Sequence, residues 1–247
     1  MRAILVTGCN GGIGSAIASY FIEHGYFVIG IDLQHKNKNS LSHYIQLDLA
    51  NLVDSKPLQE ELLSGIECLI LDEELDFKAI VNNAAVQILG AVSELRIDDF
   101  LFTQKVNVAA PLLIVQLFLR TLEKQQGSVI NIGSIHADLT KPKFVSYATS
   151  KAALRGLTSA LAVDLQGKIR VNCIEPAAIA TNMLIDGFKQ TPEKLAELKA
   201  CHPSQEIGRP DEIAEICFFL VNSSVTFLNG SCIGVNGAVA SRLHDPV

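Results

Sequence analysis

The sequence contains no tryptophan and no closely spaced pair of cysteines. Its six cysteines are scattered along 247 residues, without a C-x-x-C motif or a tight cluster of cysteine and histidine. A disulfide framework and a zinc site are therefore both unexpected in a chain of this size. We predict that most of the thiols are buried as small apolar side chains and that the protein holds no metal.

The chain also lacks an excess of positive charge. Lysine and arginine total 20 against 26 aspartates and glutamates, which gives a formal net charge of −6. Such a balance argues against nucleic acid or an anionic membrane surface as the main partner. No uninterrupted apolar run reaches the ~20 residues that span a bilayer, and the strand-like run from Ala3 leaves no room for a signal peptide. We expect a cytoplasmic protein with no nucleic acid and no membrane among its partners.

Hydrophobic residues make up 49% of the chain and charged residues 19%, which is typical of a globular protein with a large core. No repeat, low-complexity segment or long linker divides it, so we expect one domain over residues 1–247. Short apolar runs predict strands at 3–7, 27–32, 44–49, 78–84, 128–134, 169–176 and 231–235. Longer patterns predict helices at 13–25, 54–71, 94–124 with an interruption at Pro111, 147–165, 183–200 and 211–221.

Strands that are apolar throughout, rather than alternating, are buried on both faces. Their alternation with helices predicts an α/β fold with a doubly wound parallel sheet of the Rossmann type, in three layers α/β/α. Ligands of such sheets bind beyond the carboxyl ends of the strands. Polar residues at or just past the predicted strand ends should therefore meet in one crevice: Thr7, Asp32, Asp48, Asn82, Asn83, Ser134 and Pro176.

Glycines fill the junction between the first predicted strand and the first helix, in the sequence TGCNGGIG at residues 7–14. Glycine permits a tight turn and a close approach of backbone to a pyrophosphate, and the N–H groups that start the helix favour negative charge. The alternative is a glycine-rich turn that binds nothing, although the position at the first strand-to-helix junction favours the ligand.

Asp32 ends the second predicted strand, 18 residues after Gly14. A carboxylate there can accept hydrogen bonds from both ribose hydroxyls of an adenine nucleotide, and it repels a 2′-phosphate. We therefore expect NAD rather than NADP, although Lys36 and Lys38 follow closely and could soften that preference. Asp48, after the third strand, could face the adenine or could cap the next segment.

Tyr147 and Lys151 lie four residues apart in the sequence SYATSKAAL (residues 146–154), which places them on one face of a helix. A neighbouring ammonium makes a phenol proton easier to remove, because it stabilises the phenolate. One such pair can arise by accident, so the rest of the chain has to decide.

Further motifs occur in order along nearly the whole chain. The sequence NNAA spans 82–85, Asn107 lies in a predicted helix, and Ser134 precedes Tyr147 by 13 residues. RVNCIEPAAIAT follows at 170–181, and IGRPDEIA at 207–214. Together with the glycine loop and the tyrosine–lysine pair, these motifs resemble the short-chain dehydrogenase/reductase family in its compact form.

The resemblance implies an NAD(H)-dependent oxidoreductase that interconverts a secondary alcohol and a ketone. Tyr147 would be the general acid/base, supported by Lys151, Ser134 and Asn107. The residues expected to bind NAD are Gly8, Asn10, Gly12, Ile13, Gly14, Asp32, Leu33, Asp48, Leu49, Asn83, Ala84, Ala85, Ile132, Tyr147, Lys151, Pro176, Ala177, Ile179 and Thr181. The resemblance also implies a lid-like substrate segment at about 182–206 and a homotetramer or homodimer, with the apolar helix near 100–122 and the Tyr147 helix as contact surfaces.

Some features depart from the family pattern or leave alternatives open. Ala85 and Ala177 stand where glycine is usual, and each adds a Cβ near the expected cofactor. His136 could act as a second proton donor or could be a loop residue without a role. A non-catalytic dinucleotide-binding regulatory protein, or an isomerase or dehydratase on this fold, is the alternative function. The motifs do not identify the substrate.

Overall fold

Seven parallel strands form one sheet in the order β3-β2-β1-β4-β5-β6-β7 in the computed structural model, which describes residues 1–35 and 41–243. The strands are β1 (Arg2–Thr7), β2 (Phe27–Asp32), β3 (His43–Gln46), β4 (Asp76–Asn82), β5 (Ser128–Ile132), β6 (Arg170–Pro176) and β7 (Cys232–Val235). All seven strand predictions are confirmed, with boundaries that shift by a few residues at the ends.

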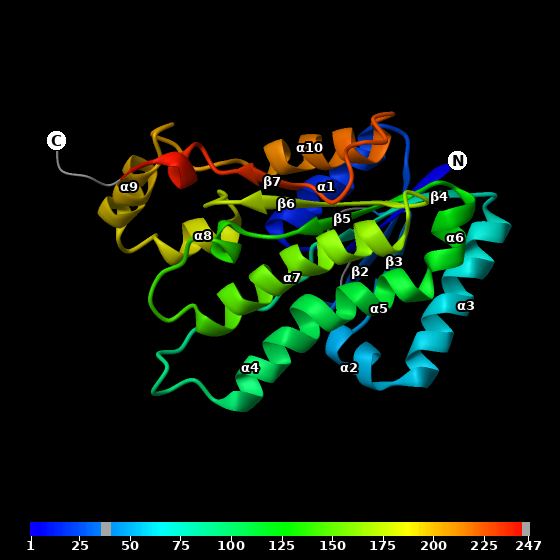
Figure 1. The fold of residues 1–247 in the computed structure, drawn as a ribbon, viewed down its shortest axis with the longest axis horizontal. Helices are drawn as coiled ribbons and strands as arrows, with labels where there is room; N and C mark the ends of the chain where they lie inside the picture. The colour runs from blue at the N-terminus through cyan, green and yellow to red at the C-terminus, as the bar shows by residue number, and fades with distance from the viewer. Residues whose placement is uncertain (36–40, 244–247) are drawn as a thin grey trace.

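Helices cover both faces of this sheet, as Figure 1 shows. Helices α1 (Gly12–Glu23) and α10 (Pro210–Asn222) pack together on one face. The other face carries α2 (Leu49–Asp54), α3 (Lys56–Asp72), α5 (Ala110–Leu117), α6 (Leu119–Lys124) and α7 (Val145–Asp164). Successive residues of a strand point to opposite faces, so Leu5 joins the core under α3 and α5, whereas Ile4 joins the core under α1 and α10. The prediction of a doubly wound, three-layer, single-domain fold is confirmed.

The helical region predicted at 94–124 is divided differently from the expectation. It contains α4 (Ile97–Gln104), a π-helical turn at Lys105–Ala109, α5 and α6. Pro111 does not interrupt it, because it lies in the first turn of α5. A proline has no N–H to donate to the carbonyl four residues earlier, which here is that of Asn107. The helix accommodates the missing hydrogen bond by a π-helical turn at Lys105–Ala109. The break falls instead at Phe118, between α5 and α6.

The predicted helix at 54–71 is likewise two helices. Ser55 leaves the helical conformation, with φ −121° and ψ 103°, and its side chain accepts a hydrogen bond from the N–H of Leu58. It thereby ends α2 and caps α3.

The continuous helical stretch Ile97–Leu117 is long and apolar enough, by length and composition alone, to cross a membrane. Polar residues such as Asp98, Gln104 and Asn107 interrupt it, so it contains no long uninterrupted apolar run. Buried helices of globular proteins pass the same test, and this stretch places Ile114 and Val115 in the core beneath the sheet.

The carboxyl ends of the strands gather at one edge of the sheet, and α8 (Asn182–Gly187) and α9 (Pro192–Cys201) lie at the same end (left in Figure 1). Asp32 and Pro176 end strands at that edge, and the glycine loop and Ser134 follow strands there. The fold thus brings the predicted site residues toward one region.

Candidate active site

The glycine loop makes a turn that only glycine allows at two positions. Gly8 has a φ of +65°, and its N–H donates to the carbonyl of Ile31 at the end of β2. A Cβ at Gly14 would lie 2.1 Å from the carbonyl oxygen of Gly8, which is backbone and cannot move aside. The start of α1 is therefore folded closely onto the end of β1, with backbone rather than side chains at the surface of the turn.

Asp32 lies beside this loop. Its Oδ2 accepts a hydrogen bond from the N–H of Asn10 at 2.9 Å, and its Oδ1 accepts one from the N–H of Gln34 at 3.1 Å. The carboxylate is half-buried and Leu33 is exposed next to it. Lys36 and Lys38, which could modify the cofactor preference, lie outside the described residues.

Asn83 and Ala84 support the loop from β4. Their N–H groups both donate to Oγ1 of Thr7 at 3.0 Å, and the Asn83 side chain donates to the carbonyls of Thr7 and Gly8. The side chain of Asn83, a residue expected to bind NAD, is thus used to brace the loop. Ala84 lies close enough that a Cβ on Gly8 would be 2.8 Å from its Cα.

Two other predicted positions have contacts within the protein. Asp48 caps α2, since its Oδ1 accepts from the N–H of Ala50 at 2.8 Å, which is the capping alternative. Leu49 is buried and packs in the core.

Asn82 joins two strands through a hydrogen bond between side chains. Its Nδ2 donates to Oδ1 of Asn131, whose Nδ2 donates in turn to Oγ1 of Thr158, both at 2.9 Å. The chain of bonds ties β4 to β5 and β5 to α7. Sequence reasoning named neither Asn131 nor Thr158, although Asn131 is a polar residue inside an apolar strand.

Tyr147 and Lys151 share one face of α7, as their spacing predicts. Nζ of Lys151 lies 5.6 Å from the centre of the Tyr147 ring. Lys151 is 3% exposed, and its ammonium donates to the carbonyl oxygen of Ile132 at 2.7 Å. Ile132 is the last residue of β5, two before Ser134, so the lysine joins the helix to the strand end that carries the serine.

Ser134 and His136 complete this side of the site. Oγ of Ser134 accepts from the N–H of His136 at 3.2 Å and caps a 3-10 turn, Ile135–Ala137. The His136 ring stacks on Phe144 with centres 4.4 Å apart and meets the Tyr147 ring edge-on at 5.8 Å. Burial lowers the pKa of His136, and the nearby Lys141 lowers it further. The contacts make Ser134, His136 and Tyr147 neighbours. The lowered pKa of His136 favours the neutral imidazole near pH 7.

Asn107 uses its side chain to hold the scaffold. Its Oδ1 accepts from the N–H of Val86, and its Nδ2 donates to the carbonyl of Val86 and to Oγ of Ser150. Ser150 donates to the carbonyl of Tyr147 at 2.7 Å. Asn107 thus connects the loop after β4 to the helix of the tyrosine. Its backbone carbonyl lies in the π-helical turn, where Pro111 cannot supply the usual helical N–H.

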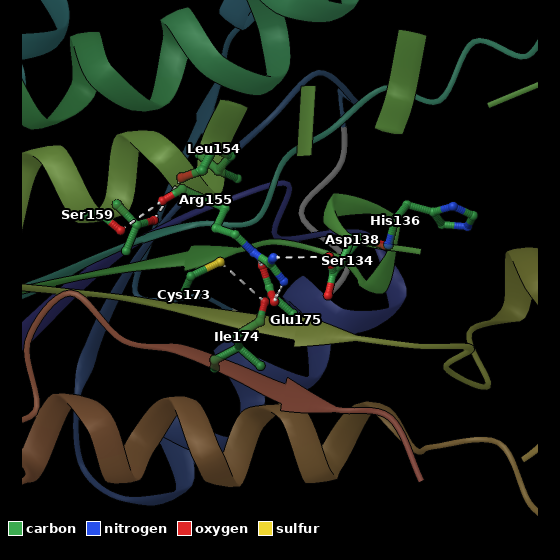
Figure 2. A network of polar contacts seen from close by, with 10 residues as sticks. Ser134, His136, Asp138, Leu154, Arg155, Ser159, Cys173, Ile174 and Glu175 are labelled. Atoms are coloured by element: carbon green, nitrogen blue, oxygen red, sulfur yellow. Dashed lines mark hydrogen bonds and ion pairs between the residues drawn. The ribbon is translucent and has the colours of Figure 1, made fainter. Parts of the chain in front are cut away.

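An ion pair that the sequence did not predict lies under the serine. Figure 2 shows Arg155 on α7 reaching Glu175 on β6, with Nε to Oε1 at 2.8 Å and a terminal guanidinium nitrogen to Oε2 at 2.6 Å. Asp138, after the 3-10 turn, lies 3.8 Å from the same guanidinium. Arg155 lies four residues after Lys151, so the helical spacing could have placed it on the same face as Tyr147 and Lys151. Nothing in the sequence indicates that Glu175 is its partner. The pair fixes the end of β6 against α7 and the serine turn.

The loop after β6 approaches the glycine loop. A Cβ on Gly12 would lie 2.6 Å from Cγ2 of Thr181, so the threonine packs directly on the start of α1. Ile179 is buried, Pro176 is the last residue of β6, and Ala177 follows it. Neither Ala85 nor Ala177 has a positive φ, so replacing glycine introduces no backbone strain at either position.

Cys173, Glu175 and Cys232 place their ligand atoms within 4.8 Å of one another. Both oxygens of Glu175 already accept bonds from Arg155, and the pKa of the Cys173 thiol is raised by its contact with Cys232 and by burial. This set of donors is therefore a poor fit to a metal ion, which needs a free carboxylate and a thiolate.

A family model described as Enoyl-(Acyl carrier protein) reductase matches residues 8–239. Protein FixR of Bradyrhizobium diazoefficiens is 31% identical, over 96% of this chain and 86% of its own. The 3-oxoacyl-(acyl-carrier-protein) reductase FabG of Thermotoga maritima is 28% identical, over 96% of this chain and 97% of its own. The solved structure of the aldohexose dehydrogenase of Thermoplasma acidophilum, in ligand-free form, has a TM-score of 0.88 at 25% identity and covers 100% of this chain and 96% of its own.

Two further solved structures hold a nicotinamide cofactor. 4-hydroxyisoleucine dehydrogenase complexed with NADH has a TM-score of 0.84 at 26% identity, covering 98% of this chain and 100% of its own. ElxO with NADP bound has a TM-score of 0.86 at 24% identity, covering 98% and 99%, and shows the fold alone. The same fold thus accommodates either cofactor.

Proposed function

This chain belongs to the short-chain dehydrogenase/reductase family of oxidoreductases, and we propose that it transfers hydride between NAD(H) and a secondary alcohol or the corresponding ketone. The observation that carries the proposal is the cluster at the edge of the sheet, where Tyr147 lies beside the buried ammonium of Lys151 and next to the turn of Ser134. Each of these side chains has the chemistry that proton transfer to or from a substrate oxygen requires.

Tyr147 is the general acid/base of this proposal. In the oxidation direction Tyr147, as the phenolate, takes the proton of the substrate hydroxyl, with Nζ of Lys151 5.6 Å from the centre of its ring. A bound NAD⁺ would supply the acceptor for the hydride that leaves the substrate carbon. Ser134 donates a hydrogen bond to the reacting oxygen and holds it near the phenol.

Asn107 contributes through its backbone. Its side chain is committed to Val86 and Ser150, so its carbonyl, in the π-helical turn, is the group available to hold a water. Such a water would pass a proton between Lys151 and solvent.

The glycine loop suits a dinucleotide, because Gly8, Gly12 and Gly14 leave no room for a Cβ against Ala84, Thr181 and the Gly8 carbonyl. The turn can therefore present backbone N–H groups to a pyrophosphate. Asp32, beside the loop, is the acceptor for ribose hydroxyls, and it disfavours a 2′-phosphate. We therefore assign NAD in preference to NADP.

The segment at about 182–206 is a lid in this proposal. Hydrogen bonds between Ala180 and Gly208 (2.8 Å) and between Gly208 and Ala178 (2.9 Å) close its base, so α8 and α9 form an excursion from a fixed neck. Thr181, at the entrance, contacts Gly12. Closure of such a segment excludes water from the reaction.

We also propose a homotetramer or homodimer in the cytoplasm. Leu101 and Phe102 on α4 and Val163 on α7 are exposed apolar side chains, at 57%, 41% and 78%. Contact surfaces of assembled proteins carry such residues. Sedimentation velocity of the purified protein tests the assembly, and a monomer at micromolar concentration would contradict it.

Titration with NADH and separately with NADPH tests the cofactor. The chain has no tryptophan, so the cofactor's own fluorescence is read without that background. Tighter binding of NADH supports the role of Asp32, whereas tighter binding of NADPH contradicts it. Saturable binding of neither by folded protein would remove the enzyme proposal altogether.

The Tyr147→Phe variant tests the chemistry. It should lose turnover while its affinity for NADH stays near that of the wild type, and Tyr20→Phe, whose ring stacks on His24 away from the site, is the matched control. Turnover is found by following NADH absorbance with a panel of ketones and alcohols that includes a 3-oxoacyl thioester and an aldohexose, since proteins similar to this chain act on these classes. Substantial activity in Tyr147→Phe would contradict the mechanism.

A further inference from the structure

A cavity lies at the edge of the sheet opposite the candidate active site, at the amino ends of the strands. It has a volume of about 440 Å³, and four cationic residues line it: Arg2, Lys78, Lys168 and Arg170. Among the residues that the structure describes, no aspartate or glutamate belongs to this lining. Figure 1 places the amino end of β1, the end of α6 and the end of α10 together on this side, away from α8 and α9. The cavity is therefore separate from the candidate active site.

The topology brings the cations together from distant parts of the chain. Arg2 begins β1, Lys78 lies in β4, and Arg170 begins β6. The order β1-β4-β5-β6 separates the outer two strands by three spacings, or ~14 Å at ~4.8 Å each. Both arginine side chains then reach the last turn of α10: Arg170 donates to the carbonyl of Leu220 at 2.9 Å, and Arg2 to Oδ1 of Asn222 at 2.9 Å.

Three of these four charges have no ion pair in the part of the chain that the structure describes. Lys168 lies 3.4 Å from Glu123. Lys78 instead donates to the neutral side chain of Gln125 at 3.0 Å, while the two arginines bond to carbonyl oxygens and to the side chains of Asn222 and Tyr26. A guanidinium has five N–H donors, and Arg170 uses two of them within the described residues. Burial also lowers the pKa of Arg170.

Gathering like charges in one cavity is costly unless something opposite in charge compensates them. Carbonyl groups at the end of α10 compensate part of the positive charge. The protein as a whole has a net charge of −6, so the excess of cations is confined to this cavity. Arginine and lysine donors converging on a cavity of this size suit a small multivalent anion.

We propose that this cavity binds a small phosphate-bearing anion. Lys78, Lys168 and the two guanidinium groups would supply the positive charge, and Ser224 and Thr226 in the same lining would add hydroxyl donors. The proposal does not depend on the function assigned to the other edge of the sheet.

Isothermal titration of the protein saturated with NADH tests the proposal, because the cofactor occupies the other site that attracts phosphate. The probes are inorganic phosphate and glycerol 3-phosphate at fixed ionic strength. We expect one saturable event per chain that weakens as sodium chloride is raised. Tighter binding of glycerol 3-phosphate would identify a phosphate ester as the ligand, and tighter binding of inorganic phosphate would identify the free ion.

Two substitutions locate the binding. Lys78→Gln should weaken it about tenfold, since one charge-assisted hydrogen bond is lost, and Lys78→Gln with Lys168→Gln should weaken it further. Lys194→Gln, an exposed lysine of α9 at the other end of the molecule, is the control and should change the affinity less than twofold. Thermal unfolding shows whether each variant is folded. No saturable binding to the wild type, or equal affinity in the folded double variant, would overturn the proposal. If the protein binds no NADH, the proposed function fails, but the lysine variants still decide this site.

Discussion

The ammonium of Lys151 lies 5.6 Å from the centre of the Tyr147 ring, one helical turn away on α7. Local spacing explains why the two side chains are neighbours, but it does not explain why the lysine is buried. The burial comes from β5, because Nζ donates to the carbonyl of Ile132 at the end of that strand. A charge that folding removes from water at a cost indicates a role other than stability.

Replacement of this lysine tests that role. Lys151→Met should lower kcat/KM by roughly 10²–10⁴-fold, the range for loss of acid–base support, while the Tm stays equal or rises because a buried charge is removed. Steady-state kinetics and thermal unfolding measure the two quantities. Lys124→Met, at an exposed position on α6, is the control. A strongly lowered Tm together with unchanged activity per folded molecule would make the lysine structural.

Replacement of Asp32 tests cofactor choice. Asp32→Ala should raise the affinity for NADPH relative to NADH by at least about tenfold, because a repelling carboxylate and an acceptor of the ribose hydroxyls are both lost. Cofactor fluorescence measures the two dissociation constants. The exposed Asp98, paired with Arg96 at 3.2 Å, provides the control Asp98→Ala. An unchanged ratio of the two dissociation constants would mean that residues other than Asp32 discriminate between NADH and NADPH.

The pKa of His136 predicts a pH dependence of stability. Burial and Lys141 hold this pKa below the ordinary value of 6.5 in the folded protein. The unfolded chain therefore binds the proton more readily, so the stabilisation is present above about pH 6.5 and is lost as the pH falls. The free energy of unfolding should decrease from pH 7 toward pH 5, and less steeply in His136→Gln than in the wild type. Urea unfolding at several pH values measures this, with His43→Gln, at an exposed position of β3, as control. Equal slopes in wild type and His136→Gln would contradict the prediction.

Two glycines should respond oppositely to alanine. At Gly14 a Cβ would lie 2.1 Å from the Gly8 carbonyl, so Gly14→Ala should lower the free energy of unfolding by about 1–3 kcal/mol or more. At Gly65 in α3 nothing lies within 4 Å of the added atom, so Gly65→Ala should raise it by about 0.5–1 kcal/mol. Urea unfolding with a common m-value decides both signs. A stabilised Gly14→Ala would contradict the close approach of loop and helix.

The sequence by itself determined the seven strands, their order along the chain and the helical segments between them, although not where those segments divide into separate helices. Apolar runs long enough for a buried strand, separated by helical patterns, leave a parallel sheet as the arrangement that buries both faces. The same local rules located the glycine loop, Asp32 and the pair of Tyr147 and Lys151, because each depends on a spacing of a few residues along the chain.

Only the tertiary structure decided which distant groups meet. Arg155 finds Glu175, Asn82 finds Asn131, and Thr181 packs on Gly12 across separate elements, so no local spacing announces these contacts. The sequence likewise did not reveal how the helix accommodates Pro111. A π-helical turn precedes this proline, and the helix continues without a break. Cations from three distant parts of the sequence likewise share one cavity because parallel strands begin at a common edge. That placement exists only after the sheet has formed.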